Sequence, residues 1–532
     1  MREESFFKGA FYLTAAGILV KLMGSANRIV LSRLLGGEGI GLYQMAYPIY
    51  LLFLGLSSAG LPVAISVLVA ERTALSDYGG ARKIFRLSFI LLIITGCLFS
   101  LLLYYGASWL ISWQIIRDQR AYYAIIVLAP AVFLVTVMSS YRGYFQGCQT
   151  MVPTALSQVV EQFVRIVTML GLVFLLLPQG LAYAAAGASF GAVPGAAAGL
   201  FLLIYYDYRY KHFFLRGRIG LGWKSKEQFT SIMARLIRLA LPVSLAHIIM
   251  PIVASIDLMI VPLRLEMAGY TIQQATELFG YLAGMAVTLM NVPTILTGAL
   301  AASLVPDVAR TAALQQKEAL IEKLELALRL ANWITIPASM GLYLLAGPLS
   351  LLLYGTNHAG PVTSILACGI VFLGMQQVTT GILQGLGHTL IPVVSLAIAA
   401  VVKIFLNYTL TALPDWGITG AAWATVVDFF VASMLNLTAL RLSLHSAWPL
   451  KGLGPVLGAT LCMGGTVLFI YHTAMTALYH NGAAVGGAIM GGIVVYVVTF
   501  LILGGFCQTD MERIPKIGLP LSRILHQFTI RR

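Results

Sequence analysis

The sequence predicts an all-α integral membrane protein, and its composition, its long apolar runs and its charge distribution support this fold class. Of the 532 residues, 59% are hydrophobic and only 10% are charged, and the mean hydropathy is +0.87. A soluble domain carries about 25% charged residues, so this chain has too few to cover a water-soluble core. A membrane barrel is excluded because it would show segments of about ten residues with alternating polarity.

The apolar runs form about fourteen segments, each long enough for a transmembrane helix of about 20 residues. They cover residues 9–34, 41–70, 85–110, 121–141, 153–178, 181–206, 239–264, 278–304, 328–353, 361–386, 389–412, 417–441, 453–477 and 484–506.

The net charge of +14 is distributed as a membrane topology requires. If the N-terminus is cytoplasmic, 26 of the 34 Lys and Arg residues fall on the cytoplasmic side, and only Arg117, Arg120 and Arg264 on the other. This asymmetry follows the positive-inside rule. We therefore expect a multi-pass protein with both termini in the cytoplasm and no nucleic-acid partner.

The two halves of the chain resemble each other at an offset of 238 residues. The matching positions are Gly60 and Gly298, Arg72 and Arg310, Phe145-Gln146-Gly147 and Leu383-Gln384-Gly385, and Arg165 and Lys403. Both halves begin on the same side, so the repeat is parallel.

The repeat predicts two six-helix lobes followed by two extra helices. The expected parts are an N-lobe at 1–206, a basic cytoplasmic linker at 207–238, a C-lobe at 239–441, and two further spans with a basic tail at 442–532. Repeated lobes favour alternating access around a central site, although duplication can also build a scaffold that transports nothing.

Polar residues follow one face of the first segment. At about 100° per residue, Lys21, Ser25 and Arg28 share this face with Thr14 and Ser32. A charged side chain within a span faces a cavity or a partner, so we expect this segment to line a hydrated cationic path. Arg33 lies near its outer end, where it can also extend to the membrane surface.

Other spans also carry charged residues. Glu161 and Arg165 lie four residues apart in the fifth segment, where they either line the cavity or form an internal salt bridge. Asp257 and Arg264 in the seventh segment and Lys403 in the eleventh are further cavity or coupling candidates. Asp257 could pair with Lys21 or Arg28, or bind a coupling ion.

Five basic residues against three acidic ones within the spans favour an anionic substrate, and phosphate suits Arg and Lys. Gly191, Gly195 and Gly199 repeat every four residues in the sixth segment and permit close helix packing. The motifs GxxxxGK[ST] and HExxH are absent, and we expect neither an enzyme nor a metal or other cofactor.

The stretch from Arg28 to Tyr50, RIVLSRLLGGEGIGLYQMAYPIY, is similar to the stage V sporulation protein B and polysaccharide-biosynthesis branch of the multidrug/oligosaccharidyl-lipid/polysaccharide (MOP) exporter superfamily. The stretches at 59–66, 279–285 and 304–306 resemble it too, and the resemblance covers nearly the whole chain. It implies a V-shaped bundle of two lobes in the bacterial cytoplasmic membrane. Where related lipid II flippases carry an Arg-Asp pair, this chain has Asn27-Arg28, and Arg33 matches their later Arg.

The resemblance implies a flippase for undecaprenyl-diphosphate-linked glycans, either a peptidoglycan precursor such as lipid II or a polysaccharide repeat unit. Lys21 and Arg28, with Ser25, Asn27 and Arg33, would hold the diphosphate while the polyprenyl tail stays among the membrane lipids. H⁺ or Na⁺ is a possible coupling ion. The alternatives are a drug/cation antiporter, a membrane-embedded glycan-processing enzyme and a cell-wall scaffold that does not transport.

Overall fold

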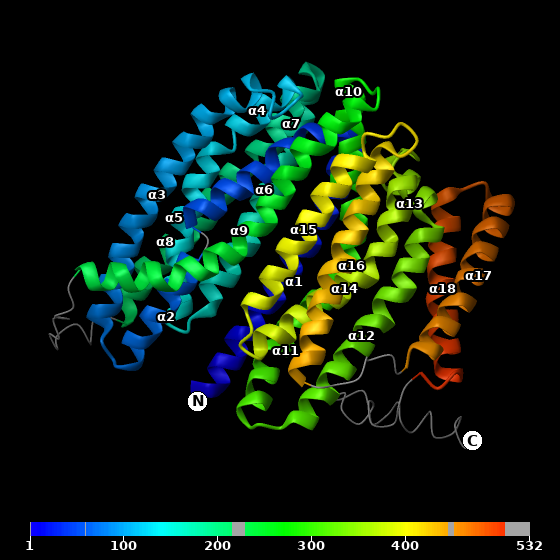
Figure 1. The fold of residues 1–532 in the computed structure, drawn as a ribbon. Helices are drawn as coiled ribbons and strands as arrows, with labels where there is room; N and C mark the ends of the chain where they lie inside the picture. The colour runs from blue at the N-terminus through cyan, green and yellow to red at the C-terminus, as the bar shows by residue number, and fades with distance from the viewer. Residues whose placement is uncertain (1, 59, 215–228, 445–451, 506–532) are drawn as a thin grey trace. The chain divides into compact units, whose positions relative to one another are not determined.

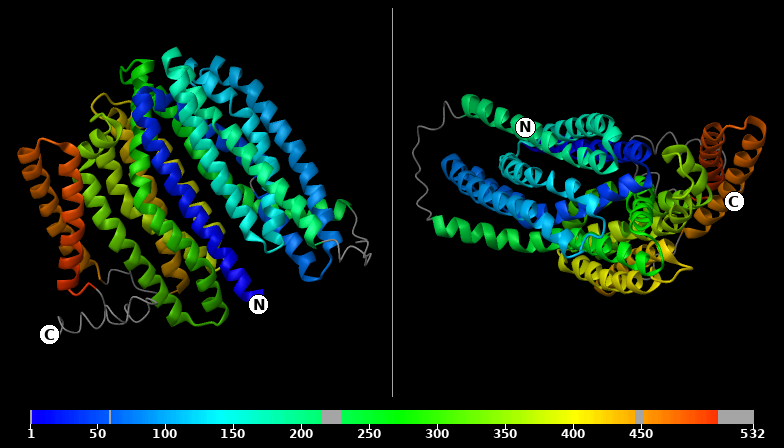
Figure 2. Two further views of the ribbon diagram at one scale, coloured as in Figure 1. Left: turned by 180° about the vertical axis from the view of Figure 1, so that it is seen from behind. Right: turned by 90° about the horizontal axis from the view of Figure 1, so that it is seen from above.

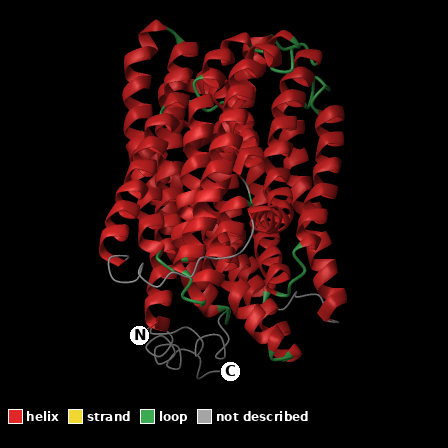
Figure 3. Cartoon of the chain, turned by 90° about the vertical axis from the view of Figure 1, so that its left-hand side faces the viewer, coloured by secondary structure: helices red, strands yellow, loops and turns green. Residues whose placement is uncertain are grey.

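The computed structural model describes residues 2–58, 60–214, 229–444 and 452–505, and within these ranges it contains helices and no strand (Figure 3). The predicted all-α fold class is confirmed. The middle of the predicted linker, residues 215–228, and most of the predicted tail, residues 506–532, lie outside the described residues.

Helices account for nearly all of the described chain (Figure 1). In chain order, the helices are first α1 (Arg2–Ser58), α2 (Leu61–Ala74), α3 (Tyr78–Ser112), η1 (Gln119–Ala121), α4 (Tyr122–Ile126), α5 (Ala129–Gly147), α6 (Met151–Leu176), η2 (Leu177–Gln179), α7 (Leu181–Phe190) and α8 (Ala192–Phe214). Then follow α9 (Phe229–Met267), α10 (Ile272–Phe279), the π-helical turn η3 (Gly280–Ala286), α11 (Val287–Ala313), α12 (Lys317–Leu344), α13 (Ala346–Tyr354), α14 (Gly360–Gly385), α15 (Leu390–Leu410), α16 (Gly417–Leu444), α17 (Leu453–Leu478) and α18 (Asn481–Ile502).

Each of the fourteen predicted apolar segments overlaps one or more of these helices. Among the described residues, 12 helices are long and apolar enough to cross a membrane, or 13 if the pair α12 and α13, bent by 77°, forms one span. The count is lower than fourteen because the candidate Tyr12–Ala74 contains the first two predicted segments.

The chain divides into two compact units at positions other than the predicted lobe boundaries. The first unit contains residues 1–288 and 404–421, and the second contains residues 289–403 and 422–532. Helix α9, which begins the C-lobe in the sequence repeat, is therefore part of the first unit. The lobes remain a prediction of the sequence.

The internal repeat is visible in how equivalent glycines pack within each unit. A Cβ atom on Gly147 would lie 2.7 Å from the Ser66 carbonyl oxygen of α2, and one on Gly385 would lie 2.8 Å from the Val305 carbonyl oxygen of α11. Because both glycines bring a helix against the backbone of its neighbour, the two halves of the chain share a local architecture.

Helix α1 bends sharply at Gly36, where φ is +67°. In a straight helix the 19 residues between Arg28 and Tyr47 would cover about 28 Å. The Arg28 guanidinium carbon instead lies 5.8 Å from the centre of the Tyr47 ring. The bend, visible near the top of α1 in Figure 1 and from behind in Figure 2, thus turns the second part of α1 back toward the first.

Candidate anion-binding site

The first part of α1 carries the polar face that the sequence predicts. Lys21 is exposed, whereas Ser25 and Arg28 are half-buried. Asn27 is buried, and its Nδ2 atom donates a hydrogen bond to Met169 Sδ of α6 at 3.0 Å. Arg33 is exposed. Asn27 therefore attaches α1 to α6, while Lys21, Ser25 and Arg28 keep part of their surface open.

Three tyrosines on the second part of α1 lie beside these cations. Tyr43 and Tyr47 stack with ring centres 5.6 Å apart, and Tyr50 follows with its ring centre 5.8 Å from that of Tyr47. Arg28 lies over the Tyr47 ring, a cation–π contact. Tyr43 is within electrostatic range of both Arg28 and Arg165. The tyrosine row thus links α1 to the charged residues of α6.

A carboxylate held by two guanidinium groups lies between α5 and α6. Arg165 Nη2 is 2.7 Å from Glu161 Oε1, and Arg142 Nη2 is 2.8 Å from Glu161 Oε2. Arg142 Nε also donates a hydrogen bond to Ser157 Oγ at 3.1 Å. The side chains of Arg142, Glu161 and Arg165 are only 13–18% exposed. The predicted pairing of Glu161 with Arg165 is present, with Arg142 as a second partner.

These residues form an interior cluster, defined as Arg28, Arg142, Glu161 and Arg165, with an excess of positive charge. The cluster contains three guanidinium groups and one carboxylate, and Arg28 and Lys21 form no ion pair with a described residue. The Nε atom of Arg165 is buried without a hydrogen-bond partner. Buried charge is costly unless it is paired, so the interior cluster can accept an anion.

Glycines at the start of α8 and just before it pack closely against α6 behind the interior cluster. A Cβ atom on Gly195 would lie 2.7 Å from the Glu161 carbonyl oxygen, and one on Gly191 would lie 2.9 Å from the Arg165 carbonyl oxygen. Only glycine permits this approach without a shift of the backbone. The glycine repeat of the sixth segment therefore has a definite role, because it packs α8 against the turn that carries Glu161 and Arg165.

The candidates in the seventh and eleventh segments lie elsewhere. Asn407 Nδ2 of α15 donates a hydrogen bond to Asp257 Oδ1 of α9 at 2.8 Å, and Lys403, one turn earlier on α15, is buried. Arg264 Nε donates to the Tyr408 carbonyl oxygen at 2.7 Å, and its guanidinium lies over the Tyr408 ring. The predicted pairing of Asp257 with Lys21 or Arg28 is not found among the described residues.

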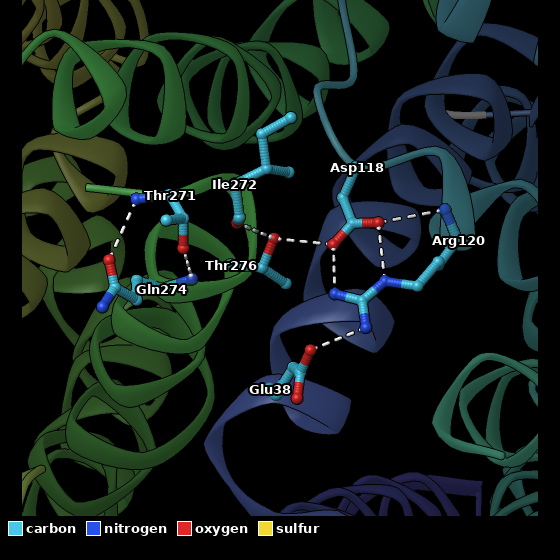
Figure 4. A network of polar contacts seen from close by, with 7 residues as sticks. All are labelled: Glu38, Asp118, Arg120, Thr271, Ile272, Gln274 and Thr276. Atoms are coloured by element: carbon cyan, nitrogen blue, oxygen red, sulfur yellow. Dashed lines mark hydrogen bonds and ion pairs between the residues drawn. The ribbon is translucent and has the colours of Figure 1, made fainter. Parts of the chain in front are cut away.

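A second polar region, the rim network, lies at the bend of α1, far along the helix from the N-terminus (Figure 4). Arg120 holds Asp118 through two hydrogen bonds of 3.0 and 2.7 Å and reaches Glu38 of α1 at 2.6 Å. Thr276 of α10 donates a hydrogen bond to Asp118 Oδ2 at 2.9 Å. Three segments distant in the sequence are thereby joined.

Arg117 and Glu266 extend the rim network to the end of α9. Arg117 donates two hydrogen bonds, of 2.9 and 2.6 Å, to the Glu266 carboxylate. The hydrogen bond with Glu266 raises the pKa of Arg117. Burial opposes the ionisation of Asp118, but hydrogen bonds from Arg120 and Thr276 outweigh it, so the pKa of Asp118 lies below its ordinary value. Asp118 and Arg117 therefore remain charged near neutral pH.

Arg142 and the tyrosine row are residues of this site that the sequence patterns missed. Arg142 lies one residue beyond the predicted segment 121–141, whereas α5 continues to Gly147. Tyr43, Tyr47 and Tyr50 have the i, i+4, i+7 spacing of a single helix face. That spacing is the sequence pattern from which the tyrosine row could be predicted.

Comparison with known families identifies two overlapping matches. A family model described as polysaccharide biosynthesis protein matches residues 6–312, which is more than half of the chain. A second model, MatE, matches residues 267–409.

Curated relatives extend over most of the chain. Stage V sporulation protein B of Bacillus subtilis strain 168 is 30% identical, over 98% of this chain and 100% of that protein. Lipid II flippase MurJ of the same organism is 29% identical, over 81% of this chain and 82% of its own length.

Solved structures share the fold. A structure of lipid II flippase MurJ in an inward closed conformation matches with a TM-score of 0.70 and 14% identity, covering 92% of this chain and 98% of that one. An inward-facing multidrug resistance MATE family transporter of the MOP superfamily matches with a TM-score of 0.64 and 16% identity, covering 80% and 94%. These matches confirm the MOP-type bundle.

Proposed function

The chain belongs to the polysaccharide biosynthesis protein family, whose members are transporters and flippases and not enzymes, and we propose that it is a flippase. Its proposed substrate is a polyprenyl-diphosphate-linked glycan, which it moves across the cytoplasmic membrane. The headgroup enters from the cytoplasmic leaflet and leaves toward the outer leaflet by alternating access, with both termini on the cytoplasmic side. No covalent bond is broken.

The single observation that carries this proposal is the excess of positive charge in the interior cluster beside the polar face of α1. Lys21 and Arg28 keep part of their surface open, and Arg165 keeps a buried donor without a partner. Arginine suits a phosphate because its planar group offers several donors at once. A diphosphate would bring the negative charge that these residues lack.

In this proposal the diphosphate contacts Lys21 and Arg28, the glycan lies in hydrated space beside the polar face of α1, and the polyprenyl tail stays among lipids. Ser25 and Asn27 position the turn of α1 that carries Arg28. Arg33 attracts the anionic headgroup at the membrane surface. Asp257 with Asn407 is a candidate for coupling to H⁺ or Na⁺, because a half-buried carboxylate next to an amide can hold a cation.

A drug/cation antiporter would need the opposite balance, a cavity rich in carboxylates. The interior cluster has three cations to one anion, which argues against a cationic substrate. A scaffold without transport activity is distinguished from a flippase by the transport experiment that follows.

The experiment is reconstitution of the purified full-length protein in vesicles with labelled undecaprenyl-diphosphate lipids, carrying either a peptidoglycan precursor or a polysaccharide repeat unit. We expect protein-dependent appearance of at least one of these lipids in the opposite leaflet and slow movement with Arg28→Ala. The absence of movement of every diphosphate lipid, or movement of a cationic amphiphile instead, would contradict the proposal.

A further inference from the structure

Glu161 binds Arg142 and Arg165 as a bound oxyanion would, through both of its oxygens. Each carboxylate oxygen accepts from a different guanidinium group, Oε1 from Arg165 and Oε2 from Arg142, at 2.7 and 2.8 Å. Phosphate oxygens make the same charge-assisted hydrogen bonds to guanidinium groups. A diphosphate that reaches these arginines therefore competes with Glu161 for the same donors.

Among the described residues, Glu161 forms no ion pair other than those with Arg142 and Arg165. Helices α1, α5, α7 and α8 pack against α6. The charged and titratable groups that face Glu161 are Arg142 from α5, Arg165 from its own helix and Tyr50 from α1. Helix α8 contributes Gly195 and Gly199 at this level, and α7 contains no charged residue.

We propose that Glu161 is an internal counter-anion that holds the place of the substrate diphosphate, and that it takes up one proton when the diphosphate displaces it. This inference rests on the proposed function. A carboxylate deprived of both arginines in a largely buried position is more stable protonated than charged. The proton comes from water and is bound by a Glu161 oxygen, and the arginines exchange one anion for another.

The consequence is a proton-linked affinity. If one proton binds together with each diphosphate, the dissociation constant rises about tenfold for each unit of pH. When the diphosphate is released outward, Glu161 would pair with its arginines again and release the proton. The proton would then be a coupling ion of the transport cycle.

The test is isothermal titration calorimetry of the full-length protein with farnesyl diphosphate, at about pH 7.5 to 9, where the ligand's own ionisation is complete. Buffers of different ionisation enthalpy report the number of protons taken up. We expect one proton per ligand for the unmodified protein. Glu161→Gln should bind the ligand with no proton uptake and an affinity that does not change with pH. Inorganic diphosphate serves as a second ligand, because equal binding of it would show that the phosphates alone are recognised.

Two further variants keep the result interpretable. Glu71→Gln removes a carboxylate from an exposed ion pair with Arg235 and should keep the full proton uptake. If Glu161→Gln alone does not fold, because it leaves two arginines without a counter-charge, the double variant Arg142→Gln/Glu161→Gln preserves the charge balance and should also bind without proton uptake.

The outcomes separate the two proposals. If farnesyl diphosphate binds to no form of the protein at any pH, the proposed function is wrong and this inference with it. If the ligand binds without proton uptake, or if Glu161→Gln retains that uptake, only the role of Glu161 is wrong.

Discussion

The interior cluster and the rim network use the same residue types in different balance. The interior cluster has three arginines and one carboxylate, whereas the rim network has two arginines, Arg117 and Arg120, and three carboxylates. Each rim arginine pairs with a carboxylate on another segment of the chain, or on its own turn. The interior cluster instead leaves Arg28 without an ion-pair partner among the described residues.

This difference indicates which charges serve the fold and which serve the substrate. A network whose cations are all paired joins segments and needs nothing from outside. In a buried cluster with surplus cations, the ion pairs do not fully offset the lost hydration of the charges. Binding an anion from outside therefore lowers the free energy of the cluster. We therefore assign the rim network to the stability of the fold and propose the interior cluster as the place for a ligand.

The largest expected effect follows from removing Arg165. Arg165→Gln should weaken farnesyl diphosphate binding about 10- to 150-fold, because hydrogen bonds to charged groups contribute about 1.5–3 kcal/mol. Titration calorimetry measures the dissociation constant. Arg209→Gln, which removes an exposed arginine of α8, should leave it unchanged. Equal dissociation constants for Arg165→Gln and Arg209→Gln would contradict the assignment of the interior cluster to ligand binding.

In the rim network the corresponding change should affect stability and not binding. Asp118→Asn leaves the donors of Arg120 poorly paired and should lower the free energy of unfolding by about 1–3 kcal/mol at pH 7. Thermal unfolding followed by circular dichroism measures this change.

The pH dependence gives this prediction a definite sign. Because the pKa of Asp118 is lowered in the folded state, its contribution is complete above the unfolded pKa of about 3.9 and is lost as pH falls through the folded pKa. The difference between Asp118→Asn and the unmodified protein should thus shrink below about pH 4. A constant difference down to lower pH would show that Asp118 does not act through its charge.

A smaller effect is expected where α8 positions the interior cluster. Gly195→Ala places a methyl group 2.7 Å from the Glu161 carbonyl oxygen and 2.9 Å from Arg165 Cβ. We expect a loss of about 1–3 kcal/mol of stability, as for other overpacked sites, with weaker diphosphate binding. Gly171→Ala is the matched control on α6, since its added Cβ meets nothing within 4 Å. If both variants behave alike, α8 does not position the cluster.

The smallest effect concerns the partly exposed pair of Arg117 and Glu266. Arg117→Glu or Glu266→Arg alone should cost about 0.2–1 kcal/mol, and the double exchange should recover most of it. Unfolding in denaturant compares the four proteins. A double variant no more stable than the sum of the single losses would mean that the two residues do not interact.

Much of the fold and part of the site follow from the sequence. Long apolar runs predict helices because a bilayer accepts few other structures. The 238-residue repeat predicts equivalent packing, as Gly147 and Gly385 show. The pairing of Glu161 with Arg165 also follows from helix periodicity alone, because both residues lie on one helix.

Contacts between distant segments do not follow from periodicity. The bend at Gly36 brings Tyr47 to Arg28, and nothing in the spacing of the apolar runs specifies its angle. The attachment of Asp118 to Thr276 joins residues 158 positions apart. Asn407, which donates a hydrogen bond to Asp257, is 150 positions away from it. Such pairs depend on tertiary packing, which a helical pattern on one segment does not contain.

The most direct test of the central claim asks whether the polar face of α1 contacts water and an anion. In a protein without native cysteines, Ser25→Cys lies on this face, while Val30→Cys lies about 140° around the helix and is 44% exposed in the structure. Labelling with a charged, membrane-impermeant thiol reagent compares them in vesicles. We predict that Ser25→Cys reacts and is protected by a polyprenyl diphosphate, and that Val30→Cys does not react because it faces acyl chains. An unreactive Ser25→Cys, or equal labelling of both positions, would contradict the account.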